Sequence, residues 1–474
     1  MGTDTFVGIE HITSTNGDDR LIGNEAANWF WTLSGSDSLF GNGGNDYFTV
    51  GLGDKIVDGG SGTDTIEILD LASSPAYTAA GITVTLALQG MAQATGVGNW
   101  TLTNIENLGG SWGNDRLTGD ANANLLAGAQ GDDTLIGGAG NDILSGDGTF
   151  NLDANSAPAF FANPNWAGGN DTLDGGDGMD TVIYSDLFRF YDVRLNGASG
   201  TIAGGLATGT DTLRSIEVVQ FKDGKLVFDV DGVAAQVIRL YDTVLDRAPD
   251  QPGLDMWVDR LEGLTGTLKD VANGFLNSAE FQGKTGSLSN ADYVEYLYLN
   301  ALGRASDPDG KAAWVAALSN GADRADLLIG FSESPEHRGL TADVVAKGYF
   351  NTDDAYQAVA LLYDSFAGRL PDEGGLIGWA EALKSGAMTL PQIASAFASS
   401  AEFLSLTAGL SNADLVEFMY RNSLDRGSDP AGKQAWVSLL DAGLSHGDLL
   451  IGFSQSTEHF FLLGDHITNG IDYF

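Results

Sequence analysis

Large apolar residues recur at intervals of nine through residues 14–67. This stretch divides without a gap into six nonapeptides of the form G-G-x-G-x-D-x-U-x, where U is a large apolar residue. Glycine permits a tight turn early in each unit, and the apolar residue follows in a short strand. A flexible glycine linker would show no such fixed phase. Each unit therefore predicts a turn and a strand whose eighth residue faces the interior, at Leu21, Phe30, Leu39, Phe48 and Ile66.

A second block of nonapeptides begins at Gly110. Four contiguous units are followed by a fifth that is interrupted after Gly148, and then by a sixth. An insertion within a repeat projects as a surface loop, and this one, residues 149–166, contains Phe150, Phe160, Phe161 and Trp166. The loop either offers a recognition surface or folds down over the strands. The second alternative is favoured, because aromatic-rich loops usually pack.

Strands are also expected between and after the two blocks. Residues 82–88 alternate between apolar and polar, and a second apolar stretch lies at 100–102, so this region predicts a larger turn of the same solenoid. Residues 183–232 contain further alternating segments. We expect them to close the solenoid, because its last coil has an unpaired edge and an open apolar core.

From residue 233 the pattern becomes helical. Four segments share a template in which Arg is followed by Asp after three residues, by Gly after six and by Trp after ten, with Ser-x-Glu further on. We expect Asp to cap a helix, Trp to lie on the inner face and Arg to pair with an acid between helices, which are structural roles. The template starts at Arg247, Arg304, Arg369 and Arg426, so a pair of repeats recurs, the first matching the third and the second matching the fourth.

The composition adds a strong acidic balance to this picture. The 474 residues carry a formal net charge of −41 and include no cysteine. Such a charge excludes nucleic acid as a partner and favours a divalent cation, while disulfides and cysteine metal sites are impossible. Neither a cleaved N-terminal signal nor an apolar run long enough to cross a membrane is present in the sequence. We therefore expect a soluble chain without a transmembrane segment.

The acidic residues concentrate at the sixth place of the nonapeptides. A turn that combines backbone carbonyls with carboxylates supplies the hard oxygen ligands that Ca²⁺ prefers. Two units have Asn28 or Asn124 at this place, so their sites should be weak or empty, and Asp54 comes one place early. The predicted ligands are Asp19, Asp37, Asp46, Asp54, Asp64, Asp115, Asp133, Asp142, Asp171 and Asp180.

This repeat resembles the RTX family of calcium-binding proteins, in which successive turns stack into a parallel β-roll. The resemblance implies that units n and n+2 stack and share several Ca²⁺ ions, with binding coupled to folding. Aspartates that only cap turns are the alternative. The implied pairs are Asp19 with Asp37, Asp37 with Asp54, Asp46 with Asp64, Asp115 with Asp133, Asp133 with Asp171 and Asp142 with Asp180.

The helical template is similar to tandem copies of domain of unknown function 4214, a helical bacterial family from which no activity carries over. Together the two resemblances imply a multidomain β + α fold. An N-terminal parallel β-roll, or β-solenoid, in two repeat blocks precedes a C-terminal all-α domain of four helical repeats in two tandem pairs. The predicted boundaries are 1–109 for the first block with its spacer, 110–232 for the second with its insertion and capping strands, and 233–345 and 346–474 for the two helical pairs.

An enzyme is the rival class. The sequence contains no H-E-x-x-H, and structural repeats account for both halves, so a non-catalytic protein is expected. Glycosidase chemistry needs only two carboxylates and is not excluded by the sequence itself. The resemblance implies secretion by a Gram-negative bacterium through type I export machinery, for which the last residues, 472–474, resemble a signal.

The expected location is therefore the extracellular space or the cell surface. There the protein would act in a surface layer, matrix or adhesion, with itself, other surface proteins or an extracellular polysaccharide as partner. The alternative is a calcium-dependent carbohydrate-binding or enzyme-accessory protein.

Overall fold

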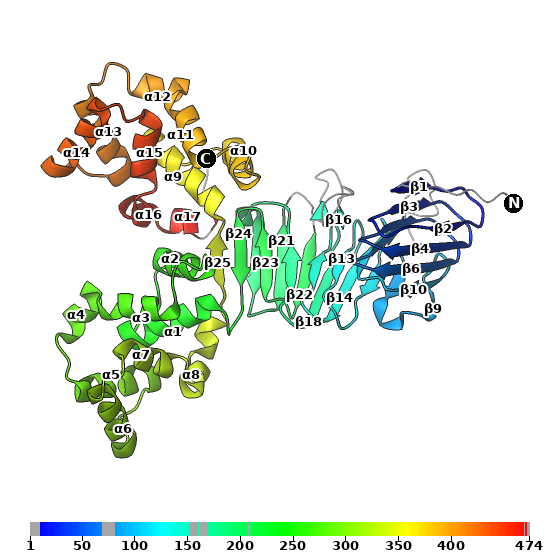
Figure 1. Ribbon diagram of the computed structural model, residues 1–474, viewed down its shortest axis with the longest axis horizontal. Coiled ribbons are helices and arrows are strands. Elements are labelled where there is room, and N and C mark those ends of the chain that lie inside the picture. The colour runs from blue at the N-terminus through cyan, green and yellow to red at the C-terminus, as the bar shows by residue number, and fades with distance from the viewer. Residues whose placement is uncertain are drawn as a thin grey trace. The chain divides into compact units, whose positions relative to one another are not determined.

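The chain forms two compact units. The computed structural model describes residues 10–68, 81–150, 160–161, 168–205, 209–468 and 470–471. The first unit comprises residues 1–222, 226–228 and 346–348, and the second comprises residues 223–225, 229–345 and 349–474. Figure 1 shows mainly strands in the first unit and mainly helices in the second. The β-roll and the helical repeats are thus confirmed, whereas the finer division into four parts stays a prediction.

A long parallel sheet runs through the first unit and crosses both repeat blocks. Within a block, each strand pairs with the one two nonapeptides later, as in Phe30 beside Phe48, and the same sheet continues across the spacer and across the insertion. The strands, in spatial order, are β1 (His11–Thr13), β3 (Trp29–Thr32), β5 (Tyr47–Val50), β7 (Thr65–Ile68), β11 (Asn107–Gly109), β13 (Leu125–Ala127), β15 (Ile143–Ser145), β19 (Thr181–Ile183) and β23 (Val218–Phe221).

Two shorter sheets contain the alternate half-coils. One has the order β2 (Arg20–Ile22), β4 (Asp37–Gly43), β6 (Lys55–Ser61), β10 (Asn99–Thr103) and β9 (Ala92–Ala94). The other has the order β20 (Tyr191–Leu195), β21 (Gly200–Gly204), β22 (Thr210–Arg214), β18 (Thr172–Asp177), β14 (Thr134–Ala139), β12 (Arg116–Thr118) and β8 (Thr83–Thr85). A small pair consists of β16 (Thr149–Phe150) and β17 (Phe160–Phe161).

The roll is filled by the eighth-place side chains. Phe30 and Phe48 are fully buried and stack with their ring centroids 5.0 Å apart. Because strands two nonapeptides apart are paired in register, each such side chain lies on the one two units earlier. Alternate units therefore form two columns of apolar groups, one on each side of the core. Glycine at the fourth place makes the turn possible, with φ of +94° at Gly44 and +116° at Gly140.

The spacer and the insertion follow the predictions in part. Strands β8 and β10 form in the spacer, but the chain leaves the predicted strand at a 3₁₀ turn, Leu86–Leu88, because the Thr85 hydroxyl accepts the Ala87 N–H. The closure predicted for 183–232 contains antiparallel β20 and β21, which extend the sheet beyond β22. Most of the insertion, including the side chains of its three later aromatic residues, lies outside the described residues.

Each helical repeat contains four helices. The repeats are α1 (Val233–Leu245) to α4 (Ala279–Thr285), α5 (Asn290–Leu302) to α8 (Pro335–Val345), α9 (Asp354–Ala367) to α12 (Ala401–Leu406), and α13 (Asn412–Leu424) to α16 (Thr457–Leu463). The second and third helices of the repeats are α2 (Gln251–Glu262), α3 (Leu268–Leu276), α6 (Pro308–Ser319), α7 (Arg324–Ser332), α10 (Glu373–Lys384), α11 (Leu390–Ala398), α14 (Pro430–Asp441) and α15 (His446–Ser454). Strands β24 (Gly224–Val227) and β25 (Tyr349–Thr352), helix α17 (Asp465–Thr468) and a 3₁₀ turn, Phe188–Phe190, complete the described elements.

The Arg-Asp-Gly template has the structural role that the sequence predicts. In the third repeat, Asp372 caps α10 by accepting the Gly375 N–H at 2.9 Å. Arg369 bonds both carboxylate oxygens of Glu402 and covers the ring of Tyr363. The template Trp is less buried than expected: Trp314, the second repeat's copy, remains 40% exposed at the rim of the core.

Gly375 leaves room for the tyrosine. A Cβ atom at this position would lie 2.4 Å from Tyr363 Oη, whereas one at Gly378 in the same helix would meet nothing within 4 Å. We expect Gly375→Ala to cost about 1–3 kcal/mol of unfolding free energy by overpacking. Gly378→Ala should stabilise α10 by up to about 1 kcal/mol, because alanine is the better helix former. Denaturant unfolding of the full chain, followed by the helical signal, measures both. Equal midpoints would contradict this account.

The two repeats of a pair are joined by a buried histidine. His459 Nε2 lies 2.9 Å from Asp364 Oδ2 on α9, and its Nδ1 lies 2.9 Å from the Ser454 carbonyl. His337 contacts Asp242 on α1 in the same way. Each ring nitrogen thus lies within hydrogen-bonding distance of an oxygen atom. Histidine follows the Ser-x-Glu motif only in the second and fourth repeats, so this residue marks the contact within a pair.

Candidate metal centres

The sixth-place residues form a ladder along each edge of the roll. In a ladder, one carboxylate oxygen accepts the backbone N–H of the sixth-place residue one full coil earlier. Asp64 accepts the Asp46 N–H at 2.7 Å, and Asp180 accepts the Asp142 N–H at 2.8 Å. Ladder I is formed by residues that directly precede the strands of the long sheet in the sequence. Its members are Asn28, Asp46, Asp64, Glu106, Asn124, Asp142, Asp180 and Glu217. Ladder II, on the opposite edge, contains Asp19, Asp37 and Lys55, and then Ile82, Asp115, Asp133, Asp171 and Asp211.

Six of these carboxylates have a second oxygen that is buried and accepts no hydrogen bond. Each side chain is at most 2% exposed, and a buried carboxylate oxygen without a donor or cation is costly. Unpaired oxygens are rare inside proteins, so their regular recurrence along both edges indicates a series of cation sites. The six oxygens are the Oδ2 atoms of Asp46, Asp64, Asp133, Asp142, Asp171 and Asp180.

Backbone carbonyls converge on the same places. A Cβ atom on Gly41 would lie 2.0 Å from Asp46 Oδ2 and 2.4 Å from the carbonyl oxygen of Gly59. The first-place glycine thus leaves a small space lined by carboxylate and carbonyl oxygens. Gly137 does the same between Asp142 Oδ2 and the carbonyl oxygen of Gly175. This donor set fits Ca²⁺, which takes oxygen ligands from both groups.

Burial makes these carboxyl groups difficult to ionise. It raises the pKa of Asp46 to about 7 and that of Asp171 to about 8, in both cases with the charge of a neighbouring aspartate adding to the shift. The pKa of Asp133 rises to about 10, again mainly by burial. A bound cation would reverse this, because opposite charge favours the ionised form.

The raised pKa values predict an unusual pH dependence for the chelated protein. A carboxyl group whose pKa is higher in the folded state favours folding while protonated, and this contribution is lost as pH rises through the folded pKa. For Asp46 and Asp171 that occurs near pH 7 and pH 8. In EGTA, the strand signal should therefore melt at a higher temperature at about pH 5 than at about pH 8. Saturating calcium should remove this difference. A chelated roll that is more stable at the higher pH would contradict the account.

The pairing predicted for Asp37 with Asp54 is wrong. Lys55, not Asp54, takes the sixth place, and its Nζ lies 2.7 Å from Asp37 Oδ2 and 2.7 Å from the Gly35 carbonyl, with both side chains fully buried. Asp54 is exposed and accepts the Asn99 N–H at 2.8 Å. The lysine ammonium thus occupies the position of a cation.

Two other predicted ligands have a donor for the oxygen, Oδ2, that is unpaired in the other six. Asp19 is partly exposed, and its Oδ2 accepts from the backbone and hydroxyl of Thr15. In Asp115, Oδ2 accepts the Ser111 N–H at 2.5 Å. In the asparagine unit of the second block, Asn124 Nδ2 donates to the Glu106 carbonyl at 2.8 Å. These positions lack the unpaired oxygen that marks the other six.

The structure adds three acids that the sequence prediction missed. Glu106 and Glu217 accept the N–H groups of Asp64 and Asp180 and so end the two runs of ladder I. Asp211 takes the next place after Asp171 on ladder II. Each of these acids lies in a short sequence motif. The motifs are I-E-N-L at 105–108, I-E-V-V at 216–219 and G-T-D-T-L at 209–213.

Comparison with known families agrees with both halves. The RTX calcium-binding nonapeptide repeat (4 copies) matches residues 4–39, 13–48, 31–66, 109–148 and 167–185. Domain of unknown function (DUF4214) matches residues 234–285, 272–341, 346–407 and 394–462. The chain carries RTX calcium-binding repeats and four DUF4214 copies. The repeats imply calcium binding and suggest a secreted protein.

A likeness to one solved structure is more limited. The crystal structure of the extracellular lipase LipA from Serratia marcescens aligns with 14% identity and a TM-score of 0.16, over 42% of this chain and 37% of the lipase. The chain thus matches little more than a third of that protein, and the likeness supports no functional argument. The comparison with curated proteins gave no match. Among the described residues, no helix is both long and apolar enough to span a membrane.

Proposed function

We propose that this RTX protein is a secreted, non-catalytic protein whose roll is folded by calcium. Six buried carboxylate oxygens without a donor support this proposal most directly. Calcium would be held at Asp46 and Asp64, at Asp142 and Asp180, and at Asp133 with Asp171. Since the unfolded chain does not assemble these oxygens, the free energy of binding becomes free energy of folding.

The charge of the chain suits folding after export. A net charge of −41 opposes compaction, and low cytosolic calcium would leave the repeats open. A type I export route from a Gram-negative cell would then deliver an unfolded chain that folds in extracellular calcium. The suggested export signal, residues 472–474, lies outside the described residues.

Outside the cell we propose a surface-layer, matrix or adhesion role, in which the roll serves as a calcium-built spacer. Light scattering of the full chain against calcium tests this, with EGTA as the reference and the Asp142→Asn/Asp180→Asn variant as control. Assembly that grows with calcium and is weaker in the variant supports the role. A protein that binds calcium, stays monomeric and binds a polysaccharide saturably would instead favour the carbohydrate-binding alternative.

A further inference from the structure

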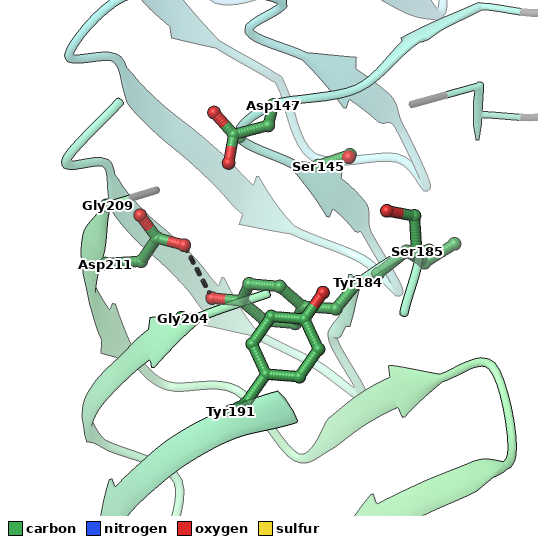
Figure 2. A pocket seen from close by; sticks show the side chains of 10 residues that line it. Ser145, Asp147, Tyr184, Ser185, Tyr191, Gly204, Gly209 and Asp211 are labelled. Atoms are coloured by element: carbon green, nitrogen blue, oxygen red, sulfur yellow. Dashed lines mark hydrogen bonds between the residues drawn. The ribbon is translucent and has the colours of Figure 1, made fainter. Parts of the chain in front are cut away.

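Three carboxylates meet near the closing end of the roll: the sixth-place Asp171 and two acids, Asp147 and Asp211, that the predicted ligand set does not include. Asp147 follows β15 at the start of the interrupted unit, Asp171 precedes β18 and Asp211 lies in β22. One carboxylate oxygen from each lies within 4.8 Å of the other two. Figure 2 shows Asp147 and Asp211 from two different segments around one cavity, with Tyr184 beside Asp211. The second place of the nonapeptide, where Asp147 stands, is glycine at Gly138 and Gly176.

Asp171 supplies the second, independent observation. Its side chain is 1% exposed, its Oδ1 accepts the Asp133 N–H at 2.8 Å, and its Oδ2 is without any hydrogen-bond donor. A Cβ atom on Gly146 would lie 1.9 Å from that oxygen, so the unpaired atom faces the turn that carries Asp147. A fully buried, unpaired carboxylate oxygen beside two further carboxylates calls for a cation.

The other two carboxylates are positioned by neutral donors. Asp147 Oδ1 accepts the Gly169 N–H at 2.8 Å, across the insertion. Asp211 accepts the Asp171 N–H at 3.0 Å and the Tyr184 hydroxyl at 2.8 Å. None of the ion pairs found among the described residues involves these three acids, in contrast to Asp37, which has Lys55. Their charges are therefore oriented but not neutralised.

The cavity beside the cluster has room for an ion with its water. Its volume is about 100 Å³, and Asp147, Tyr184, Tyr191 and Asp211 are among its lining residues. A water molecule takes about 30 Å³ in the liquid, so an ion that keeps part of its hydration fits. Gly146, the first-place glycine of the interrupted unit, lines the same cavity.

We propose that Asp147 and Asp211 join the sixth-place Asp171 in binding a divalent cation, Ca²⁺ by its ligand chemistry, at the turn of the interrupted unit, where the site is open to the cavity. The bound ion connects the turn that precedes the insertion with the closing strand β22. The proposal rests on the proposed calcium function for the identity of the ion. Its ligands Asp147 and Asp211 are additional to that function.

Calorimetric titration of the full chain with calcium tests the site. Asp147→Asn keeps the oxygen that accepts the Gly169 N–H, so the variant should fold. We expect it to bind one ion fewer per chain than the wild type. The matched control is Asp120→Asn, since Asp120 also stands second in its nonapeptide and its carboxylate accepts from the backbone and side chain of Asn122. The control should retain the wild-type count.

A second readout uses Tb³⁺ in place of calcium, with the luminescence excited through tyrosine. Removal of the site next to Tyr184 should lower the emission of Asp147→Asn and Asp211→Asn relative to Asp120→Asn, while circular dichroism shows an intact roll. An unchanged ion count and emission in Asp147→Asn would overturn this proposal and leave the repeat sites standing. A wild-type chain that binds no calcium would overturn both proposals.

Discussion

Replacing Lys55 by methionine should destabilise the roll by about 3–5 kcal/mol, the cost of leaving a buried charge unpaired. The ammonium is enclosed by Asp37 Oδ2 at 2.7 Å and by the carbonyls of Gly35 and Leu52 at 2.7 and 3.0 Å. Methionine has a similar length but supplies no charge and no donor. Denaturant unfolding in saturating calcium, followed by the strand signal, measures the loss.

Two further variants separate charge from packing. Arg194→Met removes an exposed ion pair with Asp192 and should leave the transition unchanged. Lys55→Asp restores the residue type of the repeat, so it should be unstable in EGTA but bind one more calcium ion than the wild type. The account of Lys55 as a built-in cation fails if Lys55→Met unfolds at the same denaturant concentration as the wild type.

Substitution of Asp142 and Asp180 by asparagine should change stability with opposite signs in calcium and in EGTA. In calcium, the variant loses a ligand pair, and one site at a hundredfold excess over its Kd contributes about 2.7 kcal/mol. In EGTA, it loses two carboxyl groups whose pKa is raised by burial, so the roll should become more stable. Asn124 shows how an amide is accommodated, through its bond to the Glu106 carbonyl.

Thermal melts of the strand signal under both conditions measure this reversal. Asp19→Asn is the matched control, because its outer oxygen already has donors from Thr15 and should hold no ion. A double variant that melts below the wild type in EGTA as well as in calcium would mean that the two aspartates have only a structural role.

The nonapeptide period predicts the fold well, because stacking of every second nonapeptide buries each eighth-place side chain against the one two units earlier. Phe48 and Leu39 are fully buried as expected. The ligand set was harder to predict, because it depends on which donors reach the second oxygen of each aspartate. Nothing in the nonapeptide pattern distinguishes Asp115, which Ser111 satisfies, from Asp133, whose Oδ2 has no donor.

The residues that interrupt the nonapeptide pattern make contacts that the period alone does not predict. Because Asp54 stands one place early in its unit, the sequence suggested a displaced ligand. The strand register instead pairs Asp37 with Lys55, so Lys55 takes the sixth place in the ladder. Asp147 looks like a remnant of an interrupted unit, and only the fold brings it close to Asp211, which lies beyond the last nonapeptide. In the helical half, by contrast, capping and ion pairing are local, and the Arg-Asp-Gly spacing alone predicts the contacts of Arg369 and Asp372.

Calcium titration of the EGTA-stripped full chain, with circular dichroism and calorimetry recorded together, would show whether calcium folds the roll. We expect a gain of strand signal in residues 1–232 as several ions bind, while the helical signal is already present without calcium. If calcium changes neither the spectrum nor the melting temperature, the unpaired aspartate oxygens are not calcium ligands and the account is wrong.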